Sequence, residues 1–205
     1  MTAPPDSSSS GSSGNWLFKN KEHGKASAAA SLGMILLWDT DSGLAQLDKY
    51  LHSNDTHVVA GALLGIGIVT CGVKNDCDPL KMHLSAVLGD SQSPLEVLVF
   101  SAIALGLVFV DSCNEEIAQF IFALMERSEA ELVEPIIRLL HVALGLLYLG
   151  KQESVETTAE VSKTFDEKIG KYCDVTLMSL AYAGTGDVLK VQKLLGICSQ
   201  HLEKM

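Results

Sequence analysis

The sequence is short of basic residues. It contains 15 Lys and Arg against 25 Asp and Glu, which gives a formal net charge of -10 and a pI near 4.9. A chain with this balance repels phosphate backbones, so we expect no nucleic acid among its ligands. Proteins with basic surfaces are the partners that the charge favours.

Long apolar runs are also missing. A helix that crosses a membrane needs about 20 apolar residues, whereas the strongly apolar run from Val97 to Val110, between Glu96 and Asp111, is shorter than this. A second apolar run, at 139–149, is shorter and contains His141. We therefore expect no membrane span, and we interpret both runs as helices buried on nearly all sides.

The cysteine pattern gives no sign of an extracellular protein. The number of cysteines is odd, and the pattern Cys-x-x-Cys does not occur. The five are Cys71, Cys77, Cys113, Cys173 and Cys198. We predict free, structurally buried thiols in the reducing cytosol or nucleus. Residues 1–14 have neither the basic start nor the apolar run of a signal peptide.

Metal-binding motifs are not evident. His52 and His57 are five residues apart, a spacing that does not place two ligands on one helix face. The acidic segment 39–43 resembles a calcium loop, but its glycine comes one position early and Tyr50 occupies the position of the final Glu. An inter-helix turn is the favoured interpretation, and we predict no metal site.

Catalytic and cofactor motifs are missing as well. The Gly65-Ile-Gly67 pair lacks the third glycine of a dinucleotide-binding loop. The segment 184–187 lacks the Lys-Ser/Thr of a phosphate loop, and there is no Gly-x-Ser-x-Gly elbow. We therefore predict a protein that is not an enzyme and has no cofactor.

What the sequence does contain is a repeat. A motif of small and apolar residues recurs in five segments, for example Ala-Ile-Ala-Leu-Gly-Leu at 102–107 and His-Val-Ala-Leu-Gly-Leu at 141–146. Its equivalent positions are Gly33, Gly67, Gly106, Gly145 and Ser179, with spacings of 34, 39, 39 and 34 residues. A period of this length is typical of stacked helix-pair repeats.

A second marker lies five residues after the first. It is glycine in three copies, at Gly72, Gly150 and Gly184, and Trp38 and Asp111 occupy it in the others. A glycine just after an apolar helix favours a left-handed C-terminal cap. Two features that recur in phase support the repeat more strongly than either alone.

Each repeat has room for two helices. We predict strongly apolar first helices at 26–38, 57–71, 94–110, 133–149 and 171–183. We predict more polar second helices at 42–53, 79–89, 114–127, 152–165 and 186–202. Ser93-Pro94-Leu95-Glu96 offers an N-cap, a proline at the first position and a capping-box Glu, and Asn114 offers an N-cap for the helix at 114–127.

The predicted fold is an all-α solenoid of about five helix-pair repeats. First helices lined with Gly and Ala can approach one another closely and form an inner layer, and the second helices form an outer layer that faces water. Because residues 7–14 are only Ser and Gly, we expect a flexible N-terminal segment at 1–20. The helical-repeat domain then covers 21–205.

Acidic residues gather on the predicted outer helices of the third and fourth repeats. From Asp111 to Glu167 there are 12 acidic and 4 basic residues. The cluster includes Glu115, Glu116, Glu126, Glu129, Glu153, Glu156 and Glu160. One interpretation is a solvated outer face, and the other is a docking strip for a partner with a basic rim.

Several strings in this sequence resemble one known family. They lie at 15–24 (Asn-Trp-Leu-Phe-Lys-Asn-Lys-Glu-His-Gly), 27–39, 72–79, 112–114 (Ser-Cys-Asn) and 181–192. With the Ala-Leu-Gly-Leu inner helices, they resemble the proteasome/cyclosome repeat family, as found in the base of the 26S proteasome regulatory particle. The similarity runs from about Asn15 to the end of the chain.

The resemblance implies a non-catalytic scaffold in the cytoplasm and nucleus. In this family the repeats close into a toroid of two concentric helix layers and contact other proteasome base subunits. The outer helices bind ubiquitin, the ubiquitin-like domains of shuttle factors and a deubiquitinase. The alternative is a purely structural spacer without receptor activity.

The resemblance also implies site residues. The family's ubiquitin strip uses acidic positions on the outer helix after the Ser-Cys-Asn turn, which Glu116 and Glu126 match. The middle position is apolar here, around Phe120 or Ile121, and the helix is one residue shorter. The predicted binding residues are Glu115, Glu116, Phe120, Glu126, Glu129, Glu156 and Glu160.

Two larger departures concern the extent of the chain. Members of the family are several times longer, so this chain corresponds to only part of the toroid. One repeat is also predicted to be missing at the junction near Pro79 and Leu80. Loss of a whole repeat preserves the alternation of inner and outer helices.

Overall fold

The computed structural model describes residues 15–73, 93–126, 135–165 and 167–202, and it is all-helical over these residues. Contacts divide the chain into two compact units, Met1–Val108 and Phe109–Met205. This all-helical structure agrees with the predicted α-solenoid. The helix predicted at 79–89 lies outside the described residues.

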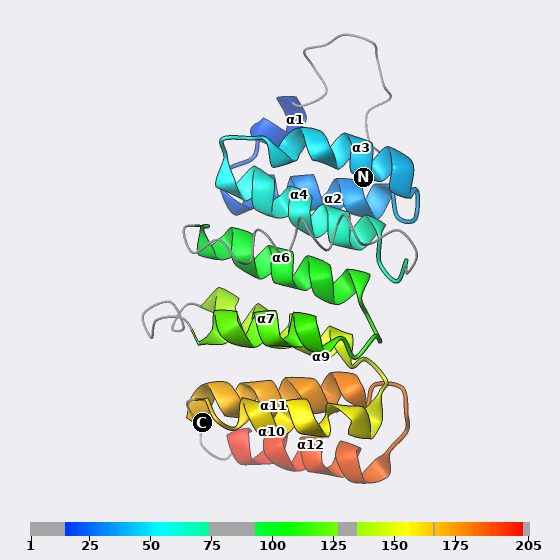
Figure 1. Cartoon of the computed structure of the whole chain (residues 1–205). Helices are drawn as coiled ribbons and strands as arrows, with labels where there is room; N and C mark the ends of the chain where they lie inside the picture. Colours follow the sequence, from blue (N-terminus) through cyan, green and yellow to red (C-terminus); the bar gives the residue numbers. More distant parts are fainter. Residues whose placement is uncertain (1–14, 74–92, 127–134, 166, 203–205) are drawn as a thin grey trace. The chain divides into compact units, whose positions relative to one another are not determined.

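The first unit has three apolar helices side by side. They are α2 (His23–Ile35), α4 (Thr56–Val69) and α6 (Leu95–Val108), and α4 contacts both of the others (Figure 1). The helix α3 (Thr40–Leu51) packs on α4 as an outer helix. This confirms the predicted inner helices of the first three repeats and the outer helix of the first.

A short helix, α1 (Asn15–Phe18), precedes this stack. Its Leu17 is fully buried and packs with Ala28, Ala29 and Val58. The packed part of the chain therefore includes residues within the 1–20 segment that we predicted to be flexible, because Leu17 supplies an apolar anchor. Residues 1–14 lie outside the described residues.

The second unit continues the same alternation. Its inner helices α9 (Arg138–Leu147) and α11 (Glu167–Ala181) pack against each other. The outer helices α7 (Glu115–Met125), α10 (Glu156–Ser162) and α12 (Val188–Leu202) contact this pair. The segments predicted as single helices at 133–149 and 152–165 each begin as a 3-10 turn, at Pro135–Ile137 and Gln152–Val155.

Glycine permits direct backbone contact between the inner helices of the first unit. A Cβ atom added at Gly33 would lie 2.3 Å from the Gly65 carbonyl oxygen, and one added at Gly67 would lie 2.4 Å from Ala104 Cα. A larger residue at either position would require the neighbouring backbone to shift. This confirms the close approach that we predicted from the small-residue motif.

The motif acts differently in the second unit. A Cβ atom at Gly145 would meet the side chain of Leu180, at 2.3 Å, instead of backbone. Ser179 is exposed and is not part of a helix contact of this kind. Direct backbone contact is therefore not found at the last two copies, because the Leu180 side chain lies against Gly145 and Ser179 is exposed.

The second marker adopts one conformation in all five repeats. The φ angles are 67° at Trp38, 71° at Gly72, 65° at Asp111, 70° at Gly150 and 72° at Gly184. The predicted left-handed cap is therefore confirmed, and it extends to the two positions without glycine.

This cap connects successive inner helices. At four of the five positions the backbone N–H donates a hydrogen bond to a carbonyl near the end of the next inner helix. The pairs are Trp38 to Val69 (3.2 Å), Gly72 to Leu107 (3.2 Å), Asp111 to Leu146 (3.1 Å) and Gly150 to Leu180 (3.1 Å). The in-phase marker therefore corresponds to a repeated inter-helix hydrogen bond.

Among the described residues, no helix has the length and apolar character needed to cross a bilayer. The apolar run at 97–110 forms most of α6, in which nine residues are buried.

Candidate partner-binding surface

The predicted binding residues on α7 lie on its outward face. Asn114 begins the helix, and its side chain accepts a hydrogen bond from the Ile117 N–H at 3.1 Å, as predicted. The buried side of the helix is apolar and consists of Ile117, Ala118, Ile121, Leu124 and Met125. The exposed side consists of Glu115, Glu116, Gln119, Ala123 and Glu126.

The middle of this surface is apolar. Phe120 is half-buried between the acidic ends of α7, and Ile121 is fully buried. Of the two residues considered for the middle position, Phe120 is therefore the one with accessible surface. Phe122 stacks on Phe165 with ring centroids 5.7 Å apart, which connects α7 to the segment that follows α10.

The second group of predicted residues lies on α10. Glu156 and Glu160 are exposed, whereas Thr158 between them is buried. The Thr158 hydroxyl donates a hydrogen bond to the Tyr148 oxygen at 2.7 Å, and burial raises the pKa of Tyr148. This contact holds the inward face of α10 against the end of α9, so that its glutamates face outward.

Lysines surround the α10 glutamates. Glu160 forms an ion pair with Lys163 at 2.5 Å, and this contact raises the pKa of Lys163. Glu156 and Glu160 also line a hollow of about 320 Å³ together with Lys163, Lys190 and Lys193. The α10 part of the predicted strip is therefore balanced in charge by these lysines.

Glu129 lies outside the described residues. The structure brings the other predicted residues together on the outer helices of the second unit. It places Glu115, Glu116, Phe120 and Glu126 on one helix face, and Glu156 and Glu160 on another.

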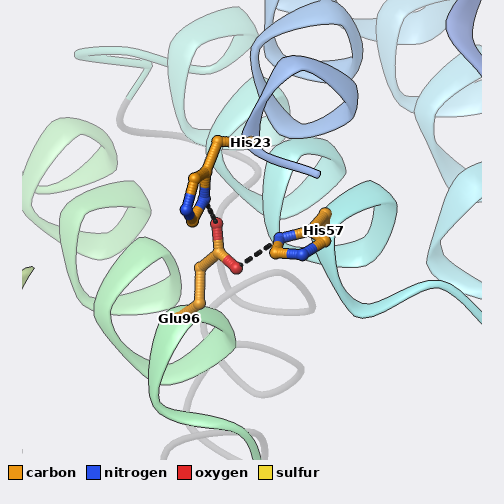
Figure 2. A group of neighbouring side chains, drawn as sticks. All are labelled: His23, His57 and Glu96. Carbon is orange, nitrogen blue, oxygen red and sulfur yellow. Dashed lines mark hydrogen bonds and ion pairs between the residues drawn. The ribbon is translucent and has the colours of Figure 1, made fainter. Parts of the chain in front are cut away.

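A second cluster was missed by the sequence analysis. His23, His57 and Glu96 lie at the beginnings of α2, α4 and α6, and their side chains converge (Figure 2). Glu96 Oε1 is 3.2 Å from His23 Nδ1, and Glu96 Oε2 is 2.6 Å from His57 Nδ1. The two imidazole rings are 5.1 Å apart and lie edge to face. Glu96, which the sequence assigned to a capping box, is thus directed at two histidines.

The repeat contained a signal for this cluster. His23, His57 and Glu96 each lie ten residues before the equivalent glycines Gly33, Gly67 and Gly106. They are therefore the same position in three successive repeats. The spacing of His52 and His57 concerns ligands within one helix, whereas stacking brings together residues one repeat apart.

The cysteines differ in environment. Cys173 is fully buried, and burial raises its pKa to about 11. Cys71 and Cys113 are half-buried. Cys198 is exposed on α12, so the prediction of buried thiols was wrong there, because α12 is an outer helix with much of its surface in solvent. Cys77 lies outside the described residues.

Comparison with known proteins points to one group. Residues 27–60 match the family model described as proteasome/cyclosome repeat. The chain is 59% identical over 240 residues to the 26S proteasome non-ATPase regulatory subunit 2 homolog A of Arabidopsis thaliana, with 100% of the chain and 27% of that protein covered. It is 37% identical to the 26S proteasome non-ATPase regulatory subunit 2 of Dictyostelium discoideum, over 99% of the chain and 26% of that protein.

A fungal relative extends the comparison. The 26S proteasome regulatory subunit rpn1 of Schizosaccharomyces pombe is 37% identical, over 91% of the chain and 25% of its own length. The chain thus spans about a quarter of the length of these curated relatives.

The alignment length also bears on the missing repeat. The Arabidopsis alignment extends over 240 positions, whereas the chain has 205 residues. At least 35 positions therefore have no counterpart in this chain, a length that agrees with the loss of one repeat.

Proposed function

This chain belongs to the proteasome/cyclosome repeat family, and we propose that it is a non-catalytic scaffold segment of the base of the 26S proteasome regulatory particle. The observation that supports this most strongly is the 59% identity, over the whole chain, to a protein named as a non-ATPase regulatory subunit. The proposed partners are other base subunits, and the proposed location is the cytoplasm and nucleus, where proteasomes act.

Co-purification tests the scaffold role. The tagged full chain, expressed in cells, should recover base ATPase subunits at a constant ratio through a second purification step. The Gly67→Ala variant, whose inner helices cannot pack as described, is the control. It should recover less of the base subunits if the interaction requires the intact helix stack. Recovery of the wild-type chain without any base subunit would contradict the scaffold role.

The proposal includes a docking surface for ubiquitin and for the ubiquitin-like domains of shuttle factors. Its centre is α7, where Phe120 lies between Glu116 and Glu126. Interfaces commonly combine a central apolar side chain with a charged rim, and an acidic rim favours a partner with basic residues around its own apolar centre.

The contribution of α10 is expected to be smaller. Glu160 is paired with Lys163, and Lys190 and Lys193 line the same hollow as Glu156. Part of the negative potential is neutralised locally, so long-range attraction of a basic partner comes mainly from α7.

Nuclear magnetic resonance can test this surface. Titration of the isotope-labelled chain with ubiquitin, and separately with a ubiquitin-like domain, should shift the amide signals of residues 114–126 more than those of 152–165. The double substitution Glu116→Lys and Glu126→Lys should weaken binding by about tenfold, because both ends of the rim would then repel a basic partner.

Asp48→Lys is the matched control. Asp48 is an exposed acidic residue on α3, the outer helix of the first unit, and its reversal should leave the affinity within about twofold. If neither protein shifts residues 114–126 or 152–165, the receptor role is excluded and the chain is a structural spacer. An equal loss of affinity in Asp48→Lys and in the Glu116→Lys, Glu126→Lys double variant would indicate non-specific attraction and would also contradict the proposed site.

A further inference from the structure

The Glu96 carboxylate is enclosed at the meeting point of three inner helices. Its side chain is 14% exposed. A carboxylate withdrawn from water needs a positive partner or several hydrogen-bond donors. The groups that face it are the imidazoles of His23 and His57, while Lys25 on α2 forms an ion pair with Asp55 at 2.5 Å.

The contact with His57 is not a hydrogen bond. Glu96 Oε2 lies 2.6 Å from His57 Nδ1, yet this buried nitrogen has no hydrogen-bond partner of acceptable geometry among the described residues. When His57 Nδ1 carries no proton, its lone pair and the Glu96 carboxylate oxygen face the same small volume, an arrangement that a shared cation stabilises.

These residues form a metal-ligand set. Two imidazoles and one carboxylate are a common set for zinc and for other divalent transition metals, with a further position left for water. The three ligand atoms, one from each residue, all lie within 4.8 Å of one another. Ligands at about 2 Å from one tetrahedral ion are roughly 3.3 Å apart, so the observed separations require only small side-chain rotations.

We propose that His23, His57 and Glu96 bind one divalent transition-metal ion, Zn²⁺ in the cell. His23 is 78% exposed, so its ring can turn toward the ion, and water has access to the remaining coordination position. The metal ion coordinates imidazole in its neutral form and carboxylate in its ionised form, so any proton on these ligand atoms is released to solvent when the ion binds.

Such an ion joins three successive repeats. His23 begins α2, His57 lies in the first turn of α4 and Glu96 lies in the first turn of α6. The left-handed caps connect the opposite ends of these helices, through Trp38 and Gly72. The metal therefore fastens the N-terminal ends of a stack whose C-terminal ends are already connected. This inference is independent of the proposed partner-binding surface, whose residues all belong to the second unit.

Zinc and cobalt titrations of the full chain test the site. The exposed thiol of Cys198 could bind zinc by itself, so the experiment uses a Cys198→Ser background at pH 7.5. We expect saturable binding of one Zn²⁺ per chain by calorimetry, visible absorption bands with Co²⁺, and a rise in melting temperature that a chelator reverses.

Substitution of a ligand should abolish these effects. His57→Ala, Glu96→Gln and His23→Ala should each weaken Zn²⁺ binding at least about tenfold and remove the thermal shift. His52→Ala is the matched control, because His52 is an exposed histidine five residues from His57. The Zn²⁺ affinity of this variant should remain within about twofold of that of the parent chain. His23→Ala keeps the test valid if the other variants unfold, since the exposed His23 side chain contributes little to the core.

Three results would overturn the proposal. The first is that the parent chain shows no saturable Zn²⁺ binding. The second is that all three ligand variants still bind Zn²⁺ as the parent chain does. The third is that His52→Ala loses as much Zn²⁺ affinity as the ligand variants. In the first case, the cluster is a contact between side chains that binds no metal ion.

Discussion

At the scale of the residue, the left-handed cap is defined by backbone conformation and not by glycine. Trp38 and Asp111 adopt φ angles of 67° and 65°, which cost an L-amino acid about 1–2 kcal/mol. Both backbone N–H groups donate to the next inner helix, and the Asp111 side chain also pairs with Lys151 at 2.5 Å. These contacts offset the strain, so the repeat tolerates a side chain at this position.

Gly150 offers a direct measure of that strain. Its φ is 70°, and an added Cβ atom would have no neighbour within 4 Å, so Gly150→Ala changes conformational preference without a clash. We expect the free energy of unfolding, measured in urea by circular dichroism, to fall by about 1 kcal/mol. Gly150→Asn should reduce the free energy of unfolding by less than Gly150→Ala, because asparagine adopts the left-handed conformation more readily than alanine. An alanine variant as stable as the wild type would contradict this account.

At the scale of the element, the inner helices of the first unit depend on the absence of side chains at their contacts. In the first unit the key glycines meet backbone atoms of the neighbouring helix, so the helices cannot separate locally to admit a methyl group without losing adjacent contacts. The described outer helices differ: an added Cβ atom at Gly43, on α3, would meet the Val69 side chain, at 2.7 Å, and not backbone. Gly196, within α12, is exposed, and an added Cβ atom would have no neighbour within 4 Å.

The same substitution should therefore have opposite effects on the two layers. Gly67→Ala places a Cβ atom 2.4 Å from Ala104 Cα and should destabilise the chain by about 1–3 kcal/mol through overpacking. Gly196→Ala should stabilise it by about 0.5–1 kcal/mol, because alanine has less freedom than glycine in the unfolded chain. Chemical denaturation of both variants measures the difference. Effects of the same sign would show that the inner helices do not pack as described.

At the scale of the whole molecule, the core contains a histidine whose positive charge it does not accommodate. His141 on α9 is 2% exposed, and its Nε2 atom is buried without a hydrogen-bond partner among the described residues. Burial, with a smaller contribution from the positive charge of Arg138, lowers the pKa of His141 to about 4. The folded chain therefore keeps this imidazole neutral at pH values where the unfolded chain binds a proton.

Stability should fall in mild acid as a result. An unfolded histidine has a pKa of about 6.5. Above that pH, His141 is neutral in both states and costs the folded chain no stability. Between pH 6.5 and pH 4 only the unfolded chain binds the proton, so the free energy of unfolding falls progressively. Between pH 7 and pH 5, His141 alone should reduce the free energy of unfolding by about 2 kcal/mol.

Hydrogen exchange of the α9 amides and urea denaturation at several pH values can measure this loss. His141→Leu should flatten the dependence on pH, whereas His52→Leu, at an exposed position, should keep the wild-type slope. If His141→Leu and the wild type lose stability in parallel, another group is responsible.

Much of the fold was predictable, because periodicity identifies equivalent positions without any coordinates. The phase of Gly33, Gly67 and Gly106 predicted the inner helices of the first unit, and the second marker predicted the left-handed caps. The acidic face of α7 followed from Asn114 and the helical spacing of its apolar residues. Each of these features depends on neighbours in sequence or on a constant repeat length.

Other features were decided only by the tertiary structure. The lysines that balance Glu156 and Glu160 come partly from α12, and the packing of Leu17 depends on α2 and α4. His23, His57 and Glu96 occupy one repeat position, but their convergence required the register of three helices and the rotation of each side chain. The sequence by itself determined which residues are equivalent. Stacking determined which of them meet, because the distance between two side chains depends on the helices that separate them in space.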